Sequence, residues 1–292
     1  MQALHTADNL PLHLRRWSAE ADALGTVLVV HGLGEHIGRY QTLAARLNAA
    51  RWHVVGYDHR GHGASGGARG AIAADDSLLA DLALVVDAIA QEPPTPLVLL
   101  GHSMGGLVAA RFVAEGLASP PASWWRPVSA LILSSPALDP GMNGAQRALL
   151  ALLGPLAPNL AVANGLKPKW ISRDAAVVRA YQADPLVHDR VTPRLVRFIV
   201  DAGQQVRESA SRWTVPTLLQ WAGSDRCVAP KGSADFAASA PADVVTHLHY
   251  PALAHEIFNE PESEQVIGDL LRWLTGILSK VQTAAIPARS EA

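Results

Sequence analysis

Short, continuously apolar segments recur along this chain, and they alternate with segments in which apolar residues return at helical spacing. A short continuous apolar run is typical of a β-strand buried on both faces, as in a parallel sheet. The predicted strands span residues 10–17, 26–30, 53–57, 97–100, 131–133, 218–221 and 244–250, and the predicted helices span 40–50, 77–89, 104–118, 236–240 and 266–278. This alternation predicts an α/β fold, with a mostly parallel sheet and helices on both of its faces.

Residues 139–213 interrupt the alternation. They contain no clean buried strand, have helical character and are rich in Leu, Ala, Pro and Arg. An insertion between two strands of a parallel sheet is expected to cover the carboxyl edge, where such folds bind their ligands. We therefore predict a helical cap at 139–213, core segments at 1–138 and 214–282, and a flexible tail at 283–292.

Composition limits the classes of protein to which the chain can belong. Hydrophobic residues make up 49% of the 292 residues, which is enough for a sizeable core. The 24 basic and 26 acidic residues give a net charge of −2, which argues against a nucleic-acid partner. The single cysteine excludes an intramolecular disulfide and a cysteine-based zinc cluster. The first residues lack the apolar core of a signal peptide, so we expect a cytoplasmic protein.

The strongest chemical signal is the sequence Gly101-His102-Ser103-Met104-Gly105, which fits the pattern G-x-S-x-G. A predicted strand precedes it and a predicted helix follows, as expected for a nucleophile in a sharp strand-to-helix turn. Side chains two residues to either side of the serine would clash in such a turn, so glycine is needed there. The helix dipole would favour negative charge developing near the serine. We predict that Ser103 is a catalytic nucleophile; the alternative is a glycine-rich turn with a capping serine.

A serine hydroxyl needs a base to accept its proton and an acid to orient that base. In a fold with this turn, the chain order is serine, acid, histidine. Asp225 follows the predicted strand at 218–221, where the acid is expected. His247 and His249 alternate within a predicted strand, so packing should hold both on one face of the sheet. His255 lies in the loop before the last helix. We predict Asp225 as the orienting acid and His255 as the base.

Two backbone N–H groups are expected to stabilise the oxyanion of such a reaction. The N–H of Met104 directly follows the nucleophile. The loop His31-Gly32-Leu33-Gly34 follows an early strand, and its glycines let the backbone approach a substrate carbonyl. We predict the N–H of Leu33 as the second donor, so that the leucine side chain matters little.

The motifs HGLGEHIGRY, YDHRGHGASGG and GHSMGG, with the late Asp225 and His255, resemble the monoacylglycerol lipase and lysophospholipase branch of the α/β-hydrolase superfamily. The resemblance runs from about residue 10 to residue 278 and includes the cap sequence AYQADPLV. It implies an α/β-hydrolase fold and a serine hydrolase that needs no cofactor or metal. The implied substrates are lipid-like esters such as monoacylglycerols or lysophospholipids. The residues implied to lie near the alcohol product are Glu35, Arg39, His102 and Tyr181.

One position departs from the pattern of animal monoacylglycerol lipases. These enzymes have a second histidine three residues after the base, where this chain has Phe258. A strict preference for monoacylglycerols is therefore not implied. General carboxylic ester or thioester cleavage and acyl transfer to an alcohol or amine stay open, because the same three residues would serve all of them. A non-catalytic protein that binds an apolar ligand under the cap is disfavoured by the complete set of catalytic residues.

Other motifs carry less weight. Residues 61–66 read G-x-G-x-x-G, but no helix follows at once, so we predict a structural loop in which Asp58 and His62 anchor the HGLGEH loop. The histidines at 31, 36, 59 and 62 lack metalloprotease spacing, and loop hydrogen bonding is the simpler explanation. Cys227 is interpreted as a buried small apolar side chain rather than a reactive thiol.

The apolar segment at 148–166 is nearly long enough to cross a bilayer, but Gly154, Pro155 and Pro158 interrupt it. We therefore expect short cap helices, with one face lining an acyl tunnel and the other partly exposed. Such a patch would make a peripheral contact with a lipid surface. The alternatives are an inward-packed cap and a dimer contact, and the sequence does not define the oligomeric state.

Overall fold

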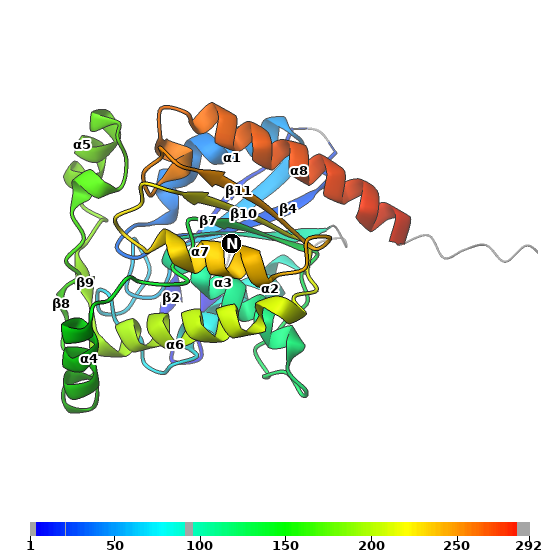
Figure 1. Ribbon diagram of the computed structural model, residues 1–292. Coiled ribbons are helices and arrows are strands. Elements are labelled where there is room, and N and C mark those ends of the chain that lie inside the picture. The colour runs from blue at the N-terminus through cyan, green and yellow to red at the C-terminus, as the bar shows by residue number, and fades with distance from the viewer. Residues whose placement is uncertain (1–3, 21, 91–95, 285–292) are drawn as a thin grey trace, which may run out of the picture.

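The computed structural model describes residues 4–20, 22–90 and 96–284 (Figure 1). The strands are β1 (Leu4–His5), β2 (Pro11–Leu12), β3 (Leu14–Trp17), β4 (Gly25–Val30), β5 (Trp52–Tyr57), β6 (Leu97–His102), β7 (Ala130–Ser134), β8 (Val162–Ala163), β9 (Arg190–Val191), β10 (Thr217–Ala222) and β11 (Val245–Tyr250). The helices are α1 (Gln41–Ala49), α2 (Ser77–Ile89), α3 (Met104–Ala114), α4 (Gly144–Leu156), α5 (Ala175–Ala183), α6 (Pro193–Ser209), α7 (Pro230–Ser239) and α8 (Ser263–Ala284).

One seven-stranded sheet organises the fold, in the order β11-β10-β7-β6-β4-β5-β3. β3 pairs antiparallel to β5, and the other neighbours pair in parallel. α1 and α8 cover one face, whereas α2, α3, α6 and α7 lie on the other (Figure 1). The predicted α/β fold, with a mostly parallel sheet between helices, is confirmed.

β4 shows why its sequence is apolar at consecutive positions. Leu28 and Val30 pack into the core on the α3 side, while Val27 and Val29 pack into the core on the α1 side. All four side chains are almost completely buried. A central strand of a sheet covered on both faces has no side that faces water, so every position favours an apolar residue.

The predicted strand at 10–17 forms two separate strands. β2 pairs with β1, and β3 joins the main sheet beside β5. His13 lies between them, and its backbone bonds elsewhere: its N–H donates to Ser65 Oγ, and its carbonyl accepts from the N–H of Asp58. The alternation of apolar residues continues across this break, which is why the sequence alone predicted one strand.

The segment predicted as a cap contains α4, α5, α6 and the antiparallel pair of β8 and β9. In Figure 1, α4, β8, β9 and α5 lie together at one end of the sheet. α6 packs differently, because its Leu195, Phe198 and Val206 are buried in the same core as α3. This helix therefore contributes to the layer that covers the sheet.

The apolar segment at 148–166 does not form the expected short helices. Its residues 148–156 belong to the single helix α4, and residues 162–163 form the strand β8. α4 runs through Gly154 and Pro155, which were expected to interrupt it, and ends at Leu156, two residues before Pro158. The residue directly before Pro158 lies outside the helix, where an extended backbone is favoured. Among the described residues, no helix has both the length and the apolarity needed to cross a bilayer. The predicted tail at 283–292 lies outside the described residues from position 285 onward.

Candidate active site

Ser103 lies in the sharp turn between β6 and α3. Its backbone has φ of 53° and ψ of −122°, a conformation that residues other than glycine rarely adopt. A Cβ on Gly101 would collide with the Gly105 carbonyl oxygen, and a Cβ on Gly105 would collide with the carbonyl oxygen of Val30. The two glycines thus permit the turn, which places the serine at the N-terminus of α3.

The structure brings Ser103, Asp225 and His255 into contact. His255 Nε2 lies 2.9 Å from Ser103 Oγ, and His255 Nδ1 lies 2.6 Å from Asp225 Oδ2. The other oxygen of Asp225 accepts hydrogen bonds from the backbone N–H groups of Cys227 and Val228. In this arrangement the imidazole can accept the hydroxyl proton while the carboxylate orients the ring.

Carboxylates control the protonation of His255. Burial by itself would lower the pKa of His255, but Asp225, Glu256 and Glu35 together raise it above its usual value. Burial would raise the pKa of Asp225, but the imidazole and the two backbone N–H groups lower it overall. The acid is therefore held as a carboxylate, and the charge that the base gains on accepting a proton is stabilised.

The two other late histidines lie apart from this group. The rings of His247 and His249 contact Trp221 at centroid distances of 5.9 and 5.1 Å, so both face the same side of the sheet as expected. Both side chains are exposed.

The two predicted oxyanion donors lie beside the nucleophile. Met104 is the first residue of α3, and Leu33 shares two cavities with Ser103. Within the described part of the chain, neither N–H has a protein hydrogen-bond partner. The loop before Leu33 is fixed, because Glu35 Oε1 accepts from the N–H of Gly32 at 2.7 Å. Both N–H groups are thus available to an oxyanion.

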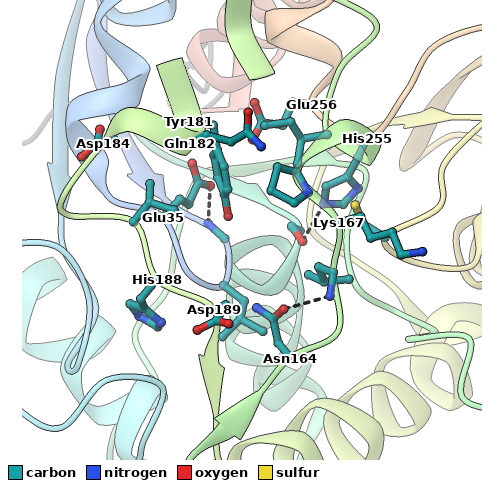
Figure 2. A pocket seen from close by; sticks show the side chains of 18 of the residues that line it. Glu35, Asn164, Lys167, Tyr181, Gln182, Asp184, His188, Asp189, His255 and Glu256 are labelled. Carbon is teal, nitrogen blue, oxygen red and sulfur yellow. Dashed lines mark hydrogen bonds between the residues drawn. The ribbon is translucent and has the colours of Figure 1, made fainter. Parts of the chain in front are cut away.

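Two cavities meet at Ser103. The first, called here the polar cavity, has a volume of about 520 Å³ and is lined by many polar side chains (Figure 2), among them Glu35, Asn164, Lys167, Tyr181, Gln182, Asp184, His188, Asp189 and Glu256. The second has a volume of about 540 Å³ and is largely apolar; its lining includes Met142, Leu149, Leu150, Val162, Val196 and Ile199. One site can thus hold a polar group in one cavity and an apolar chain in the other, with the serine lining both.

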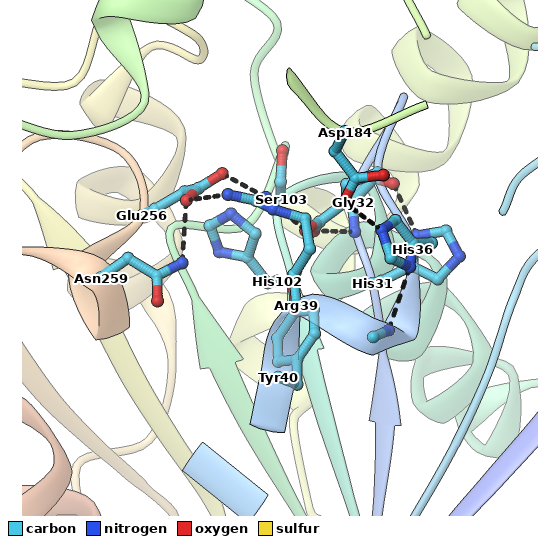
Figure 3. Close-up of polar contacts among 12 residues, drawn as sticks. His31, Gly32, His36, Arg39, Tyr40, His102, Ser103, Asp184, Glu256 and Asn259 are labelled. Carbon is cyan, nitrogen blue, oxygen red and sulfur yellow. Dashed lines mark hydrogen bonds and ion pairs between the residues drawn. The ribbon is translucent and has the colours of Figure 1, made fainter. Parts of the chain in front are cut away.

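Three of the four residues expected near an alcohol product line the polar cavity: Glu35, His102 and Tyr181. The pKa of His102 is lowered to about 4, mainly by burial, so its ring is neutral at pH 7. Arg39 is not among the lining residues. It lies behind the cavity and bonds to Glu256 (Figure 3) and to Glu35. The ring of Tyr181 lies over its guanidinium, with the ring centroid 4.7 Å away.

Sequence analysis missed the contacts between the cap and the oxyanion loop. His36 Nε2 lies 2.8 Å from Asp184 Oδ2, and the N–H of His188 donates to the carbonyl of Gly34 at 2.9 Å. It also missed Glu256, although this residue directly follows the predicted base. The motif AYQADPLV was the available signal for Asp184, but nothing in it identifies His36 as the partner.

Asp58 links the glycine-rich loop at 61–66 to Ile37, which directly follows the HGLGEH loop. The two carboxylate oxygens of Asp58 accept from the N–H groups of Ile37 and Ala64, each at 2.8 Å. The ring of His62 packs 4.6 Å from that of His188. Burial lowers the pKa of three histidines in this region, His31, His59 and His62, and neutral rings fit the packing of this loop.

Cys227 is half-buried and lines both cavities. Burial raises the pKa of its thiol, which disfavours the reactive thiolate. Among the described residues, Asp225, Cys227 and His255 form the one group of three potential metal ligands. Asp225 and His255 already bond to each other, so the hydrogen-bonded arrangement explains both side chains without a metal.

Known proteins resemble this chain over most of its length. The family model described as serine aminopeptidase, S33, matches residues 21–262. A monoacylglycerol lipase of Mycolicibacterium smegmatis is 36% identical over 270 residues, which cover 90% of this chain and 92% of that protein. The phospholipase YtpA of Bacillus subtilis is 31% identical, with 86% of this chain and 95% of that protein covered.

Solved structures agree with the sequence relatives. The monoacylglycerol lipase of Paleococcus ferrophilus is 33% identical and superimposes with a TM-score of 0.79, over 91% of this chain and 99% of that one. A variant of the monoglyceride lipase of Saccharomyces cerevisiae, 22% identical, shares the fold with a TM-score of 0.80, over 92% of each chain. The chain therefore belongs to the serine aminopeptidase S33 family, in the branch of the α/β-hydrolase superfamily that contains the monoacylglycerol lipases.

Proposed function

We propose that this protein hydrolyses esters of lipid-like carboxylic acids with small uncharged alcohols, above all monoacylglycerols, through an acyl-enzyme on Ser103. The observation that carries the proposal is the position of Ser103 where an apolar and a polar cavity meet. An acyl chain suits the apolar cavity, and a small alcohol such as glycerol suits the polar cavity. The relatives named as monoacylglycerol lipases support this substrate class, and the phospholipase supports lipid esters in general.

The reaction would run in two steps on the same residues. Ser103 Oγ attacks the ester carbonyl carbon while His255 Nε2 accepts its proton, and the N–H groups of Leu33 and Met104 stabilise the oxyanion. The bond to the alcohol then breaks, and the alcohol leaves with the proton from His255. Water attacks the acyl-enzyme with His255 again as base, which releases the acid and restores Ser103. Asp225 orients the imidazole throughout.

The charge of the polar cavity favours an uncharged alcohol. Its lining contains the carboxylates of Glu35, Asp184, Asp189 and Glu256, and Lys167 is the cation among the lining residues. A phosphorylated alcohol would bring a further negative charge toward these groups, which disfavours its binding. We propose Glu35, His102 and Tyr181 as contacts of the alcohol.

A matched substrate panel tests the proposal. Monoacylglycerols and lysophosphatidylcholines with the same acyl chains share every contact in the apolar cavity, so their difference reports the alcohol side alone. We expect kcat/KM for the monoacylglycerol to be higher by about tenfold or more, equivalent to about 1.4 kcal/mol. Equal values, or a preference for the phospholipid, would contradict the proposed alcohol. Measuring products with an added alcohol or amine separates hydrolysis from acyl transfer.

We also propose that the cap makes peripheral contact with lipid surfaces. Leu149, Leu152 and Leu156 of α4 recur at helical spacing and are 55%, 62% and 74% exposed. Leu149 also lines the apolar cavity. Exposed leucines on one helix face, next to the cavity for the acyl chain, would allow substrate to enter directly from a lipid phase.

Replacing Leu152 by aspartate should weaken liposome binding by about 30-fold, since burying a leucine side chain contributes about 2 kcal/mol. Turnover of long-chain esters in liposomes should fall, whereas turnover of short soluble esters should be retained. Ala180→Asp is the matched control, because it adds the same charge at an exposed position on α5, which also lies in the predicted cap. A change in oligomeric mass or in thermal stability, with liposome binding absent in the wild type, would favour a dimer contact or a packing role instead.

A further inference from the structure

Arg39 lies between two loops that meet at the candidate active site. Its Nη1 bonds to Glu35 Oε2 at 2.7 Å and to Glu256 Oε1 at 2.6 Å, and its Nη2 bonds to Glu256 Oε2 at 2.7 Å. The Arg39 side chain is only 11% exposed, and the two carboxylate side chains are 5% and 7% exposed. Such buried, bidentate pairs are geometrically specific, and removing one partner leaves an unpaired buried charge.

Each carboxylate is fixed to a different loop. Glu35 Oε1 accepts from the N–H of Gly32 at 2.7 Å and from the hydroxyl of Tyr40 at 2.8 Å, so it holds the residue that precedes Leu33. Glu256 directly follows His255.

Glu256 is itself anchored on both sides. Its N–H donates to the carbonyl of Ile171 at 2.7 Å, and its Oε2 accepts from Asn259 Nδ2 at 2.8 Å. Figure 3 shows the side-chain part of this chain of contacts, from Asn259 through Glu256 and Arg39 to the oxyanion loop.

We propose that Arg39 is a positioning residue that, through Glu35 and Glu256, holds the loop of Leu33 and the loop of His255 in register. This proposal rests on the proposed function, and it assigns Arg39 no contact with the alcohol. The ring of Tyr181 separates the guanidinium from the polar cavity, and the residues that line that cavity do not include Arg39. A displacement of about 1 Å between an oxyanion donor and a base can cost about 100-fold in rate.

The contact also sets the charge around His255. The titratable groups near its ring are Asp225, Glu256, Glu35, His102 and the thiol of Cys227. His102 is neutral at pH 7, and burial raises the pKa of Cys227, so its thiol is uncharged as well. Arg39 compensates part of the negative charge of Glu35 and Glu256. Loss of Arg39 would therefore raise the pKa of His255, whereas loss of the Glu256 charge would lower it. The two changes break the same contact and have opposite electrostatic effects.

Arg39→Gln and Glu256→Gln test the proposal, with monoacylglycerol and a p-nitrophenyl ester as substrates. We expect each variant to lose about 100-fold in kcat on both substrates, with KM nearly unchanged. An imidazolium cannot accept the serine proton, so kcat/KM falls as the pH drops through the pKa of His255. This acid limb should move to higher pH in Arg39→Gln and to lower pH in Glu256→Gln.

Arg46→Gln is the matched control. Arg46 also bridges to the C-terminal part of the fold, through Glu264 at 2.7 Å, but this ion pair is exposed, and its loss should leave both rates unchanged. If Arg39→Gln does not fold, the double variant Arg39→Gln/Glu256→Gln replaces it, because it removes the Glu256 charge together with that of Arg39 and leaves Glu35, which keeps its bonds to Gly32 and Tyr40, as the one carboxylate of the contact without its ion-pair partner. We expect the folded double variant to be slow on both substrates.

A higher KM confined to monoacylglycerol, with kcat unchanged on both substrates, would make Arg39 a substrate ligand and overturn the proposal. Wild-type rates in the folded variants, or acid limbs that stay in place, would overturn it as well. Failure of the proposed function is distinguishable, because the wild type would then hydrolyse neither ester or would prefer another alcohol.

Discussion

Replacing Ser103 by alanine is expected to reduce ester hydrolysis by about six orders of magnitude, the loss seen when a serine hydrolase loses its nucleophile. Without the hydroxyl, no acyl-enzyme can form, although the cavities and the oxyanion donors remain. The fold should persist, because alanine removes one oxygen atom and keeps the turn between Gly101 and Gly105. Rates on a p-nitrophenyl ester and a thermal unfolding curve measure the two effects.

Ser135→Ala provides a control of the same chemistry. Ser135 also has a positive φ, at 39°, follows β7 and bonds through its hydroxyl to the N–H of Ala222. It is not among the residues that line the two cavities. We expect a loss of about 1 kcal/mol in stability and an unchanged rate. Retention of a tenth of the activity in Ser103→Ala would remove Ser103 from the mechanism.

His255→Ala is expected to be nearly as inactive as the serine variant, because nucleophile and base act as one unit. This change removes His255 Nε2, the group 2.9 Å from Ser103 Oγ that can accept its proton at neutral pH. His249→Ala is the matched control, since His249 stacks on Trp221 and lies in the strand before this loop. Its stability should change more than its rate. An inactive His249→Ala beside an active His255→Ala would reverse the assignment.

Most of the sheet could be predicted from sequence because burial on both faces leaves a local trace. The consecutive apolar residues of β4, β6, β7 and β10 each mark a strand covered on two sides. α6 was assigned to the cap, because an amphipathic helix has the same periodicity whether its apolar face packs on α3 or under a lid. Only the tertiary contacts of Phe198 and Val206 distinguish the two cases.

The contact of Ser103 with His255 could be predicted because each residue has a local signal. The glycines mark the turn, and the place of His255 in a loop after the last strand marks the base. The contact of Arg39 with Glu256 could not be predicted. The two residues are 217 positions apart, and no motif around either residue indicates the other as its partner. Charged pairs of this kind depend on how loops approach in three dimensions, which no periodicity records.

Fluorophosphonate labelling followed by peptide mass spectrometry tests the central claim most directly. The reagent forms a stable bond to a serine that an adjacent base activates, so it reports the nucleophile without any choice of substrate. We predict one adduct per chain, on Ser103, with monoacylglycerol hydrolysis lost in proportion to labelling. An adduct on another residue, or full monoacylglycerol hydrolysis by protein labelled completely at Ser103, would contradict the account.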